Sequence, residues 1–439
     1  MSRLQPAKGK LLLKGARCVD PQAGLDVLAD ILITDGSIAA VDTAIDAPDA
    51  EILEVGGRVV VPGPVDLHVH LREPGQEYKE TIESGTRAAA HGGWTGVGVM
   101  ANTHPVVDDG AQVRSVLNKA DATGLVRVYV YGALTRGLRG EQLAEMADMV
   151  AAGAVGFSDD GHGIQNPLMM RRALQYALVF DKVVLAHAED EKLADGGVVN
   201  EGLVSTRLGL PGQPALAEEL AVRRDIALAR LTGARLHICH VSTAGAVAAI
   251  REAKAAGDVA VTAEATPHHL FLNEDALDVR YNTNLKMAPP LRSEADRVAV
   301  LEAFLDGTID ALASDHAPHA PQEKELEFEL AQFGTVGLET ALPLVLGELV
   351  AAERLSWSDF VQRVAVAPRR ILGLEPVSLA AGSVADLTVF DPAAKTKVTK
   401  DWLVGKSKNS AFLGWGVRGL ATEVIVGGQR VLKEGCVVV

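Results

Sequence analysis

The stretch VVVPGPVDLHVHLREPG at residues 59–75 places two histidines and an arginine directly after an apolar run. The run at residues 59–63 predicts a buried strand, and successive side chains of a strand point to opposite faces. His68 and His70 should therefore project from the same side, where their imidazoles can bind one metal ion. Arg72 follows at the same spacing, and its planar guanidinium suits the carboxylate of an anionic substrate. Short patterns such as His-x-His also recur by chance. The alternative is therefore that the two histidines are polar residues of a turn and bind no metal.

Several later apolar runs end in the same way, with a residue that can bind a metal ion or a carboxylate. Ala- and Leu-rich stretches of helical period separate these runs, for example residues 215–231 and 295–305. With residues 126–130 as a further strand, the chain contains about eight strand–helix units, which predicts a (β/α)8 TIM-like barrel. Active sites of this fold lie at the carboxyl ends of the strands, so the barrel would gather these distant residues into one site. The residues at the ends of the runs are Asn102, Asp159, Asp160, His187, His240, His268 and Asp315.

The two ends of the chain differ from its middle, because they are rich in strand and turn signals and lack long helical stretches. We infer one small β-sandwich domain formed by both termini, residues 1–58 with 377–439. This domain would pack on the barrel of residues 59–376. The strand signals lie at residues 10–15, 30–38, 382–390 and 424–432, the last with a two-glycine hairpin turn.

The composition indicates a chain the size of an enzyme. Its 439 residues exceed the roughly 250 of a typical barrel, which leaves room for a second domain. The net charge of −15 argues against nucleic acid or an anionic membrane surface as a partner. No segment is typical of a signal peptide or a membrane span. Cys18, Cys239 and Cys436 are far apart and odd in number, which predicts reduced thiols and a cytoplasmic location.

Seven motifs make the chain similar to the dihydroorotase family, and specifically to its bacterial class I enzymes, over essentially the whole length. The resemblance implies the reversible cyclisation of N-carbamoyl-L-aspartate to L-dihydroorotate with loss of water. This reaction belongs to de novo pyrimidine (UMP) biosynthesis and would proceed through a metal-bound hydroxide. The motifs are DLHVHLREPG (66–75), FSDDG (157–161), AHAED (186–190), HVST (240–243), TPHHL (266–270), KMAPPLR (286–292) and SDHAPH (314–319).

The resemblance also implies a metal centre with two zinc ions per chain. Carried over by position, His68 and His70 would bind the first ion, and His187 and His240 the second. Asp160 would bridge the two ions, while the neighbouring Asp159 would point away because side chains alternate. The remaining ligand, Asp315, would bind the first ion and act as the catalytic acid and base.

The substrate-binding residues implied by the family lie around this centre. Arg72, Asn102 and His319 would bind the substrate carboxylate, a task for a planar fork and neutral donors. Ala288 stands where many relatives have an asparagine that contacts the substrate, so only its backbone could serve. A small-molecule substrate and a homo-oligomer are implied as well, and an association with aspartate transcarbamoylase stays open. The full set assigned to substrate binding is Arg72, Asn102, Ala288, His319, Phe333 and Gly334.

Two other functions agree with parts of this pattern. Dihydropyrimidinases and allantoinases are similar in the His-x-His strand, but they typically use a carboxylated lysine as the bridge. No lysine lies near residues 157–160, and Arg72 with His319 suits a ring that bears a carboxylate. An inactive homologue that serves as a structural partner of aspartate transcarbamoylase would have lost metal ligands. Every predicted ligand position is occupied here, which favours an active enzyme.

Overall fold

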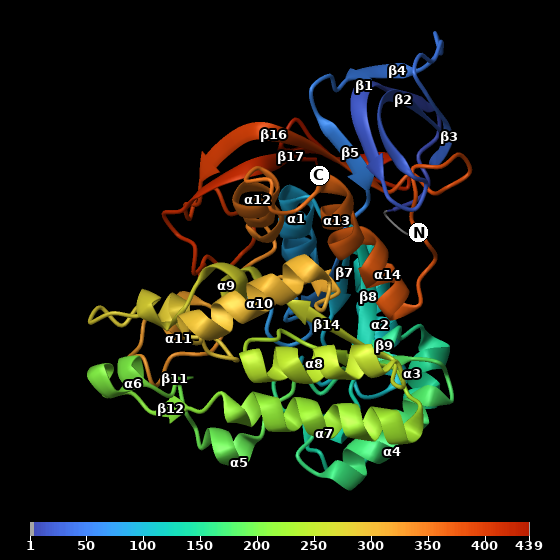
Figure 1. Ribbon diagram of the computed structural model, residues 1–439. Coiled ribbons are helices and arrows are strands. Elements are labelled where there is room, and N and C mark those ends of the chain that lie inside the picture. The colour runs from blue at the N-terminus through green and yellow to red at the C-terminus, as the bar shows by residue number, and fades with distance from the viewer. Residues whose placement is uncertain (1–3, 439) are drawn as a thin grey trace.

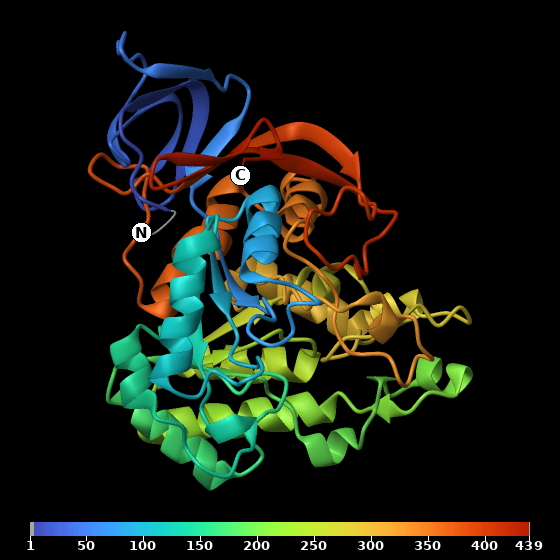
Figure 2. The ribbon, with the colours of Figure 1, turned by 180° about the vertical axis from the view of Figure 1, so that it is seen from behind.

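The computed structural model describes residues 4–438, in which strands from both ends of the chain lie above a barrel covered by helices (Figure 1). Seen from behind, the first strands and the last strands still lie side by side (Figure 2). Within the described residues, no helix is long and apolar enough to cross a membrane.

Eight parallel strands form the barrel, which confirms the fold predicted from the strand–helix alternation. They pair in the order β15-β14-β13-β10-β9-β8-β7-β6, and a parallel bridge between Val69 and His316 brings the two ends of this order together. The strands are β6 (Val65–Val69), β7 (Gly96–Val99), β8 (Arg127–Gly132), β9 (Gly156–Phe157), β10 (Val183–Ala186), β13 (Leu236–Ile238), β14 (Val261–Ala265) and β15 (Ala311–Leu312).

The apolar run at residues 59–63 is not the strand that carries the histidines, contrary to the prediction. It forms β5 (Val59–Pro62), which pairs with the terminal strands β1 and β16. The barrel begins with β6, which contains His68. Gly63 and Pro64 separate the two strands, and Pro64 has no N–H for a strand ladder. The division of the chain into residues 1–58 with 377–439 and residues 59–376 stays a prediction.

Capping side chains mark the start of several barrel helices. Helix α1 (Ile82–Gly92) starts at Thr81, whose side chain accepts from the Ser84 backbone N–H. The stretches predicted at 215–231 and 295–305 are α7 (Leu216–Thr232) and α10 (Glu294–Asp306). The remaining helices are α2 (Gly110–Thr123), α3 (Met146–Ala152), α4 (Pro167–Leu178), α5 (Glu191–Ala194), α6 (Leu203–Leu208), α8 (Ala244–Ala256), α9 (Pro267–Phe271), α11 (Pro321–Lys324), α12 (Ala341–Val345), α13 (Trp357–Val361) and α14 (Ala367–Leu372), with short turns η1 (Arg136–Leu138), η2 (Glu274–Ala276), η3 (Thr283–Leu285), η4 (Leu346–Val350) and η5 (Gln362–Val366).

Strands from both termini join in one continuous sheet, which forms the predicted small β domain. The order is β19-β18-β17-β16-β5-β1-β2-β3, with β4 paired to β1. A cluster of buried side chains that includes Leu13, Ile31 and Leu387 forms its own apolar core. The two-glycine turn between β17 and β18 has positive φ at both residues, as the hairpin prediction requires. The strands are β1 (Lys10–Asp20), β2 (Leu25–Thr34), β3 (Ser37–Asp42), β4 (Glu51–Glu54), β16 (Leu387–Lys397), β17 (Gly416–Val426), β18 (Gln429–Lys433) and β19 (Cys436–Val437), and a separate pair is β11 (Val199–Asn200) with β12 (Gly212–Gln213).

Candidate active site

A cavity of about 650 Å³ is lined by residues that follow the carboxyl ends of the barrel strands. Among the metal and substrate residues that the resemblance implies, only His68 lies beneath the cavity lining, where it is fully buried. Asp159 and His268, which also follow apolar runs, do not line this cavity. The structure therefore brings together side chains that are up to 264 positions apart, from residue 70 to residue 334. The predicted residues that line the cavity are His70, Arg72, Asn102, Asp160, His187, His240, Ala288, Asp315, His319, Phe333 and Gly334.

The Nδ1 atoms of the first two histidines are hydrogen bonded, which leaves their Nε2 atoms facing the centre of the site. Nδ1 of His68 lies 2.7 Å from Oε1 of Glu264. Nδ1 of His70 lies 2.9 Å from Oδ1 of Asn102. Because an acceptor oxygen requires the proton on Nδ1, each imidazole in its neutral form has its lone pair on Nε2, where it can bind a metal ion.

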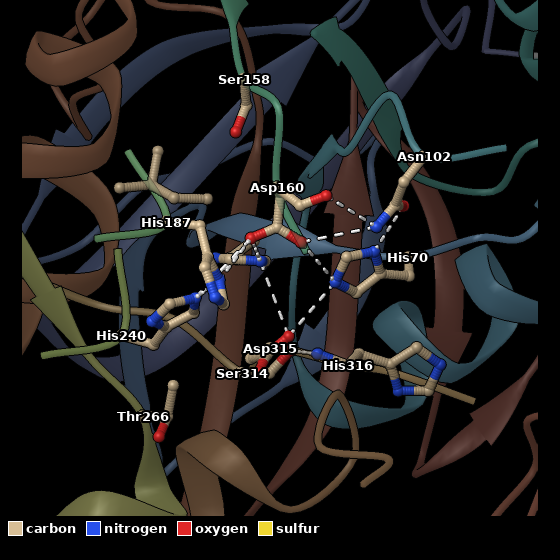
Figure 3. A network of polar contacts seen from close by, with 12 residues as sticks. His70, Asn102, Ser158, Asp160, His187, His240, Thr266, Ser314, Asp315 and His316 are labelled. Carbon is tan, nitrogen blue, oxygen red and sulfur yellow. Dashed lines mark hydrogen bonds and ion pairs between the residues drawn. The ribbon is translucent and has the colours of Figure 1, made fainter. Parts of the chain in front are cut away.

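Asp160, which follows β9, lies beside the predicted ligands His70, His187 and His240 (Figure 3). Its Oδ1 atom is 3.3 Å from Nε2 of His68 and 3.6 Å from both Nδ1 of His187 and Nε2 of His240. Its Oδ2 atom is 3.4 Å from Nε2 of His70. In the described part of the chain, Asp160 Oδ1 and His68 Nε2 are buried without a hydrogen-bond partner. A cation between these atoms would offset the cost of leaving them unpaired.

Asp315 lies on the side of the centre occupied by the first two histidines. Its Oδ1 atom is 3.3 Å from Nε2 of His70 and 3.6 Å from Nε2 of His68. Asp315 and His240 both adopt positive φ, 45° and 33°, which residues other than glycine seldom do. Such strain persists where the surrounding structure holds a side chain in one position, and it is concentrated at functional sites.

The donors around this centre fit divalent metal ions. His68, Asp160 and His240 present ligand atoms within 4.8 Å of one another, and so do His68, His70 and Asp315. Burial opposes the charge on Asp160 and Asp315, yet the surrounding imidazoles hold the pKa of both carboxyls below its usual range. Both carboxylates are thus ionised at neutral pH. Imidazole nitrogens combined with carboxylate oxygens are the ligands of catalytic zinc sites.

A buried guanidinium faces the same cavity. Arg72 is 9% exposed, and burial lowers its pKa only to about 10, so it is charged at neutral pH. Its Nε donates to the Pro318 carbonyl at 3.2 Å, and Nη2 lies 3.4 Å from Nε2 of His319. No carboxylate of the described residues forms an ion pair with Arg72. The guanidinium is therefore positioned to receive an anionic group from a ligand.

The other predicted substrate residues are also held by protein contacts. His319 Nε2 donates to the Phe333 carbonyl at 2.8 Å. Burial and the neighbouring cation Arg72 lower the pKa of His319 to about 2, so its imidazole is neutral. Asn102 uses its Oδ1 on His70, and its Nδ2 donates to the Asp160 carbonyl at 3.3 Å. Asn102 thus contacts His70 and Asp160 of the histidine–aspartate cluster as well as lining the cavity.

Glu264 is the functional residue that the sequence analysis missed. It is fully buried at the end of β14, and its Oε2 lies 3.0 Å from Nε2 of His237 while Oε1 accepts from His68. The signal available in the sequence was a glutamate between two alanines of an apolar strand, because a fully buried carboxylate requires a partner.

Replacing Glu264 with glutamine should weaken metal binding about 10- to 100-fold, the usual effect of losing a partner that orients a ligand histidine. The glutamine amide retains the shape of the side chain but loses the charge that favours the proton on His68 Nδ1. Titration of metal-free protein with zinc, followed by calorimetry, measures this affinity. An unchanged zinc affinity would show that Glu264 serves only the packing of the barrel.

Comparison with known proteins identifies the family of the chain. Residues 57–246 match the family model described as dihydro-orotase-like. The dihydroorotase of Pelotomaculum thermopropionicum is 51% identical over 425 residues, which cover 97% of this chain and 99% of the relative. The dihydroorotase of Geobacter metallireducens is 50% identical over 425 residues, covering 97% and 100%.

The fold is shared with a further class of cyclic amidohydrolase. The solved structure of an L-hydantoinase (dihydropyrimidinase) from Arthrobacter aurescens superposes with a TM-score of 0.89 at 28% identity. The superposition covers 98% of each chain. The sequence identity to the curated relatives is much higher and extends over nearly the whole length, so the chain belongs to the dihydroorotase family.

Proposed function

We propose that the chain is a dihydroorotase, which interconverts L-dihydroorotate plus water and N-carbamoyl-L-aspartate. The observation that carries this proposal is the buried, unpaired guanidinium of Arg72 in the same cavity as the cluster of histidines and aspartates. The cluster suits hydrolysis of a cyclic amide, and the guanidinium suits a ring that bears a carboxylate. Consumption of dihydroorotate by the purified protein, followed by separation of N-carbamoyl-L-aspartate, tests the proposal directly.

We propose that the centre binds two zinc ions. His68 and His70 would hold one ion together with Asp315, and the other two histidines would hold the second. Support comes from the number of donors, because four histidines and two carboxylates exceed the ligands of one tetrahedral zinc ion. The position of Asp160 between the histidines agrees with a bridging role. When bound, such ions lower the pKa of a water molecule and polarise the carbonyl oxygen of the substrate.

The proton transfers are assigned to Asp315. Its carboxylate, ionised and buried at the edge of the centre, would accept a proton from the attacking water. The water oxygen forms a bond to the ring carbonyl carbon, and the bond from that carbon to the ring nitrogen breaks. Asp315 then gives the proton to the departing nitrogen, and the carbonyl carbon becomes that of a new carboxyl group, which releases the second water proton to solvent and is left as a carboxylate. In the direction of ring closure the same group returns the proton to the oxygen that leaves as water.

The acid group of the substrate would be held by an acid-binding corner, defined as Arg72, Asn102, His319 and the segment 333–334. Arg72 supplies the charge, and the neutral imidazole of His319, whose single N–H donates to the Phe333 carbonyl, lies beside the guanidinium. Ala288 contributes no polar side chain, so only its backbone, which lines the cavity, is available to the ring. Binding through this corner would orient the ring carbonyl toward the metal centre.

A hydrolase of uncharged cyclic amides is the second candidate, because the L-hydantoinase shares the fold over 98% of both chains. The position between the histidines is occupied by Asp160 rather than by a lysine. A ring that lacks an acid group would also offer no partner for the buried charge of Arg72. A cytoplasmic homo-oligomer that associates with aspartate transcarbamoylase is proposed from the resemblance alone, and light scattering of the protein with and without that enzyme tests it.

Elemental analysis of protein purified from zinc-supplemented medium should return two metal equivalents per chain. Each ion binds ligands from separate strands, so removal by a chelator should also lower the melting temperature. Protein in which Asp225 is replaced by asparagine serves as the control, since this carboxylate is buried in α7 outside the cavity. One equivalent per chain under metal-replete conditions would contradict the two-ion centre.

A further inference from the structure

The connection between β16 and β17 leaves the terminal sheet and packs against the loops of the acid-binding corner. Ser407 Oγ donates to the Lys79 carbonyl at 2.7 Å. Two positions further, the side chain of Asn409 is enclosed between two cavity-lining loops and is 6% exposed. A segment more than 300 residues away from Arg72 in the sequence thus contacts the walls of the cavity.

Asn409 uses both polar atoms of its side chain on these loops. Oδ1 accepts from the backbone N–H of His319 at 3.0 Å. Nδ2 donates to the carbonyls of Ala317 at 3.1 Å and Gly334 at 3.2 Å. The Asn409 carbonyl accepts from Thr335 Oγ1 at 3.1 Å. Asn409 therefore connects the loop that carries His319 to the loop that carries the segment 333–334.

These two loops are packed so closely that a movement of one must displace the other. A Cβ atom at Gly334, where φ is 134°, would lie 2.6 Å from Ala317 Cβ and 3.2 Å from His319 Nε2. The Gly334 carbonyl also accepts from Lys324 Nζ at 3.0 Å. The orientation of the His319 imidazole, which donates to the Phe333 carbonyl, consequently depends on the distance that Asn409 sets between the loops.

A buried asparagine often serves only to satisfy the backbone of its own turn. The side-chain bonds of Asn409 differ, because its partners are 75, 90 and 92 positions away in the sequence. All three partners belong to cavity-lining loops rather than to the connection itself. The side chain of Asn409 therefore connects segments that are distant in the sequence through a network of hydrogen bonds.

We propose that Asn409 is a positioning residue, which holds His319 beside Arg72 and so sets the affinity of the site for the acid group of the substrate. The inference rests on the proposed function, because it concerns the acid-binding corner of that reaction. Asn409 touches neither the cavity nor the metal ligands, so it acts on the substrate only through the two loops.

The test compares Asn409→Asp and Asn409→Ala with the unmodified protein, using dihydroorotate and dihydrouracil as substrates. Aspartate keeps the acceptor for the His319 N–H but places an oxygen against the two carbonyls that the amide now donates to. Both variants should raise KM for dihydroorotate on the order of 10-fold, with kcat within about 3-fold and two metal equivalents retained. The ratio of kcat/KM for dihydroorotate to that for dihydrouracil should fall by the same factor.

Ser410→Ala is the matched control. Ser410 is the next residue and is also buried, but among the described residues its Oγ accepts only from the N–H of Phe412, in the same connection. This variant should lower the melting temperature without a change in KM or in the substrate ratio. If the Asn409 variants also lose melting temperature alone, with the ratio unchanged, the inference is overturned. An unmodified protein that does not consume dihydroorotate would instead overturn the proposed function.

Discussion

The Asp315→Asn variant should lose on the order of 10²-fold or more in kcat, the usual contribution of general acid–base catalysis. Asparagine has the shape of aspartate, but its amide cannot accept the proton of the attacking water. In the native protein the carboxylate lies 3.3 Å from Nε2 of His70, and nearby imidazoles keep its pKa below the ordinary range. It is therefore in the basic form at the start of each turnover. Steady-state rates of dihydroorotate hydrolysis measure the loss.

The metal content of this variant must be measured in the same sample, because Asp315 is also a proposed ligand. The expected outcome is low kcat with two ions bound in zinc-saturating buffer. Asp225→Asn again provides a matched control, since it removes a buried carboxylate of α7 whose only ion pair within residues 4–438 is with Arg224. Its kcat should stay within about 2-fold of that of the native protein. Near-normal turnover by Asp315→Asn with both ions in place would assign the proton transfer to another group.

The Arg72→Met variant should lose most of the preference for dihydroorotate over dihydrouracil, which we expect to reach several orders of magnitude in the native enzyme. A ring without an acid group leaves the buried guanidinium of Arg72 unpaired. It also lacks the charged hydrogen bonds that a substrate carboxylate would form with this guanidinium. Methionine fills a similar volume without either contribution. The effect should appear in kcat/KM for dihydroorotate, while both metal ions stay bound.

Arg363→Met is the control for this experiment. Arg363 is a buried arginine whose Nε also donates to a backbone carbonyl, that of Phe304, but it does not line the cavity. The preference for dihydroorotate should be unchanged in this variant. Equal kcat/KM values on the two substrates in the unmodified protein would favour a dihydropyrimidinase and remove the role assigned to Arg72.

The barrel, and the cluster of histidines and aspartates at the carboxyl ends of its strands, could be predicted from local patterns. Each predicted ligand stands at or just beyond the end of an apolar run, and the fold brings the ends of parallel strands to one edge. The strand that carries His68 was assigned wrongly, because residues 59–63 are apolar enough for either sheet. Only long-range pairing with β16 decides in favour of the terminal sheet, and no local pattern encodes that pairing.

The supporting residues were harder to predict for the same reason. Glu264 lies in an apolar strand and Asn409 in a polar connection, so their local sequences suggest nothing about His68 or His319. Their roles arise from hydrogen bonds to partners 196 and 90 positions away. Such contacts follow from tertiary packing, whereas metal ligands carry a chemical signature that is visible in the sequence.

The place of β5 between β1 and β16 has a consequence for synthesis on the ribosome. Most of the chain must be translated after β5 before its antiparallel partner exists. During that interval one edge of β5 exposes unpaired backbone groups, and the apolar residues Val59, Val60 and Val61 lack their final cover. Pairing of such distant segments is slow, since a long loop must close first. The nascent chain is therefore exposed to aggregation through this edge. A circular permutant in which the terminal strands are adjacent in the sequence should lose less protein to aggregation during refolding.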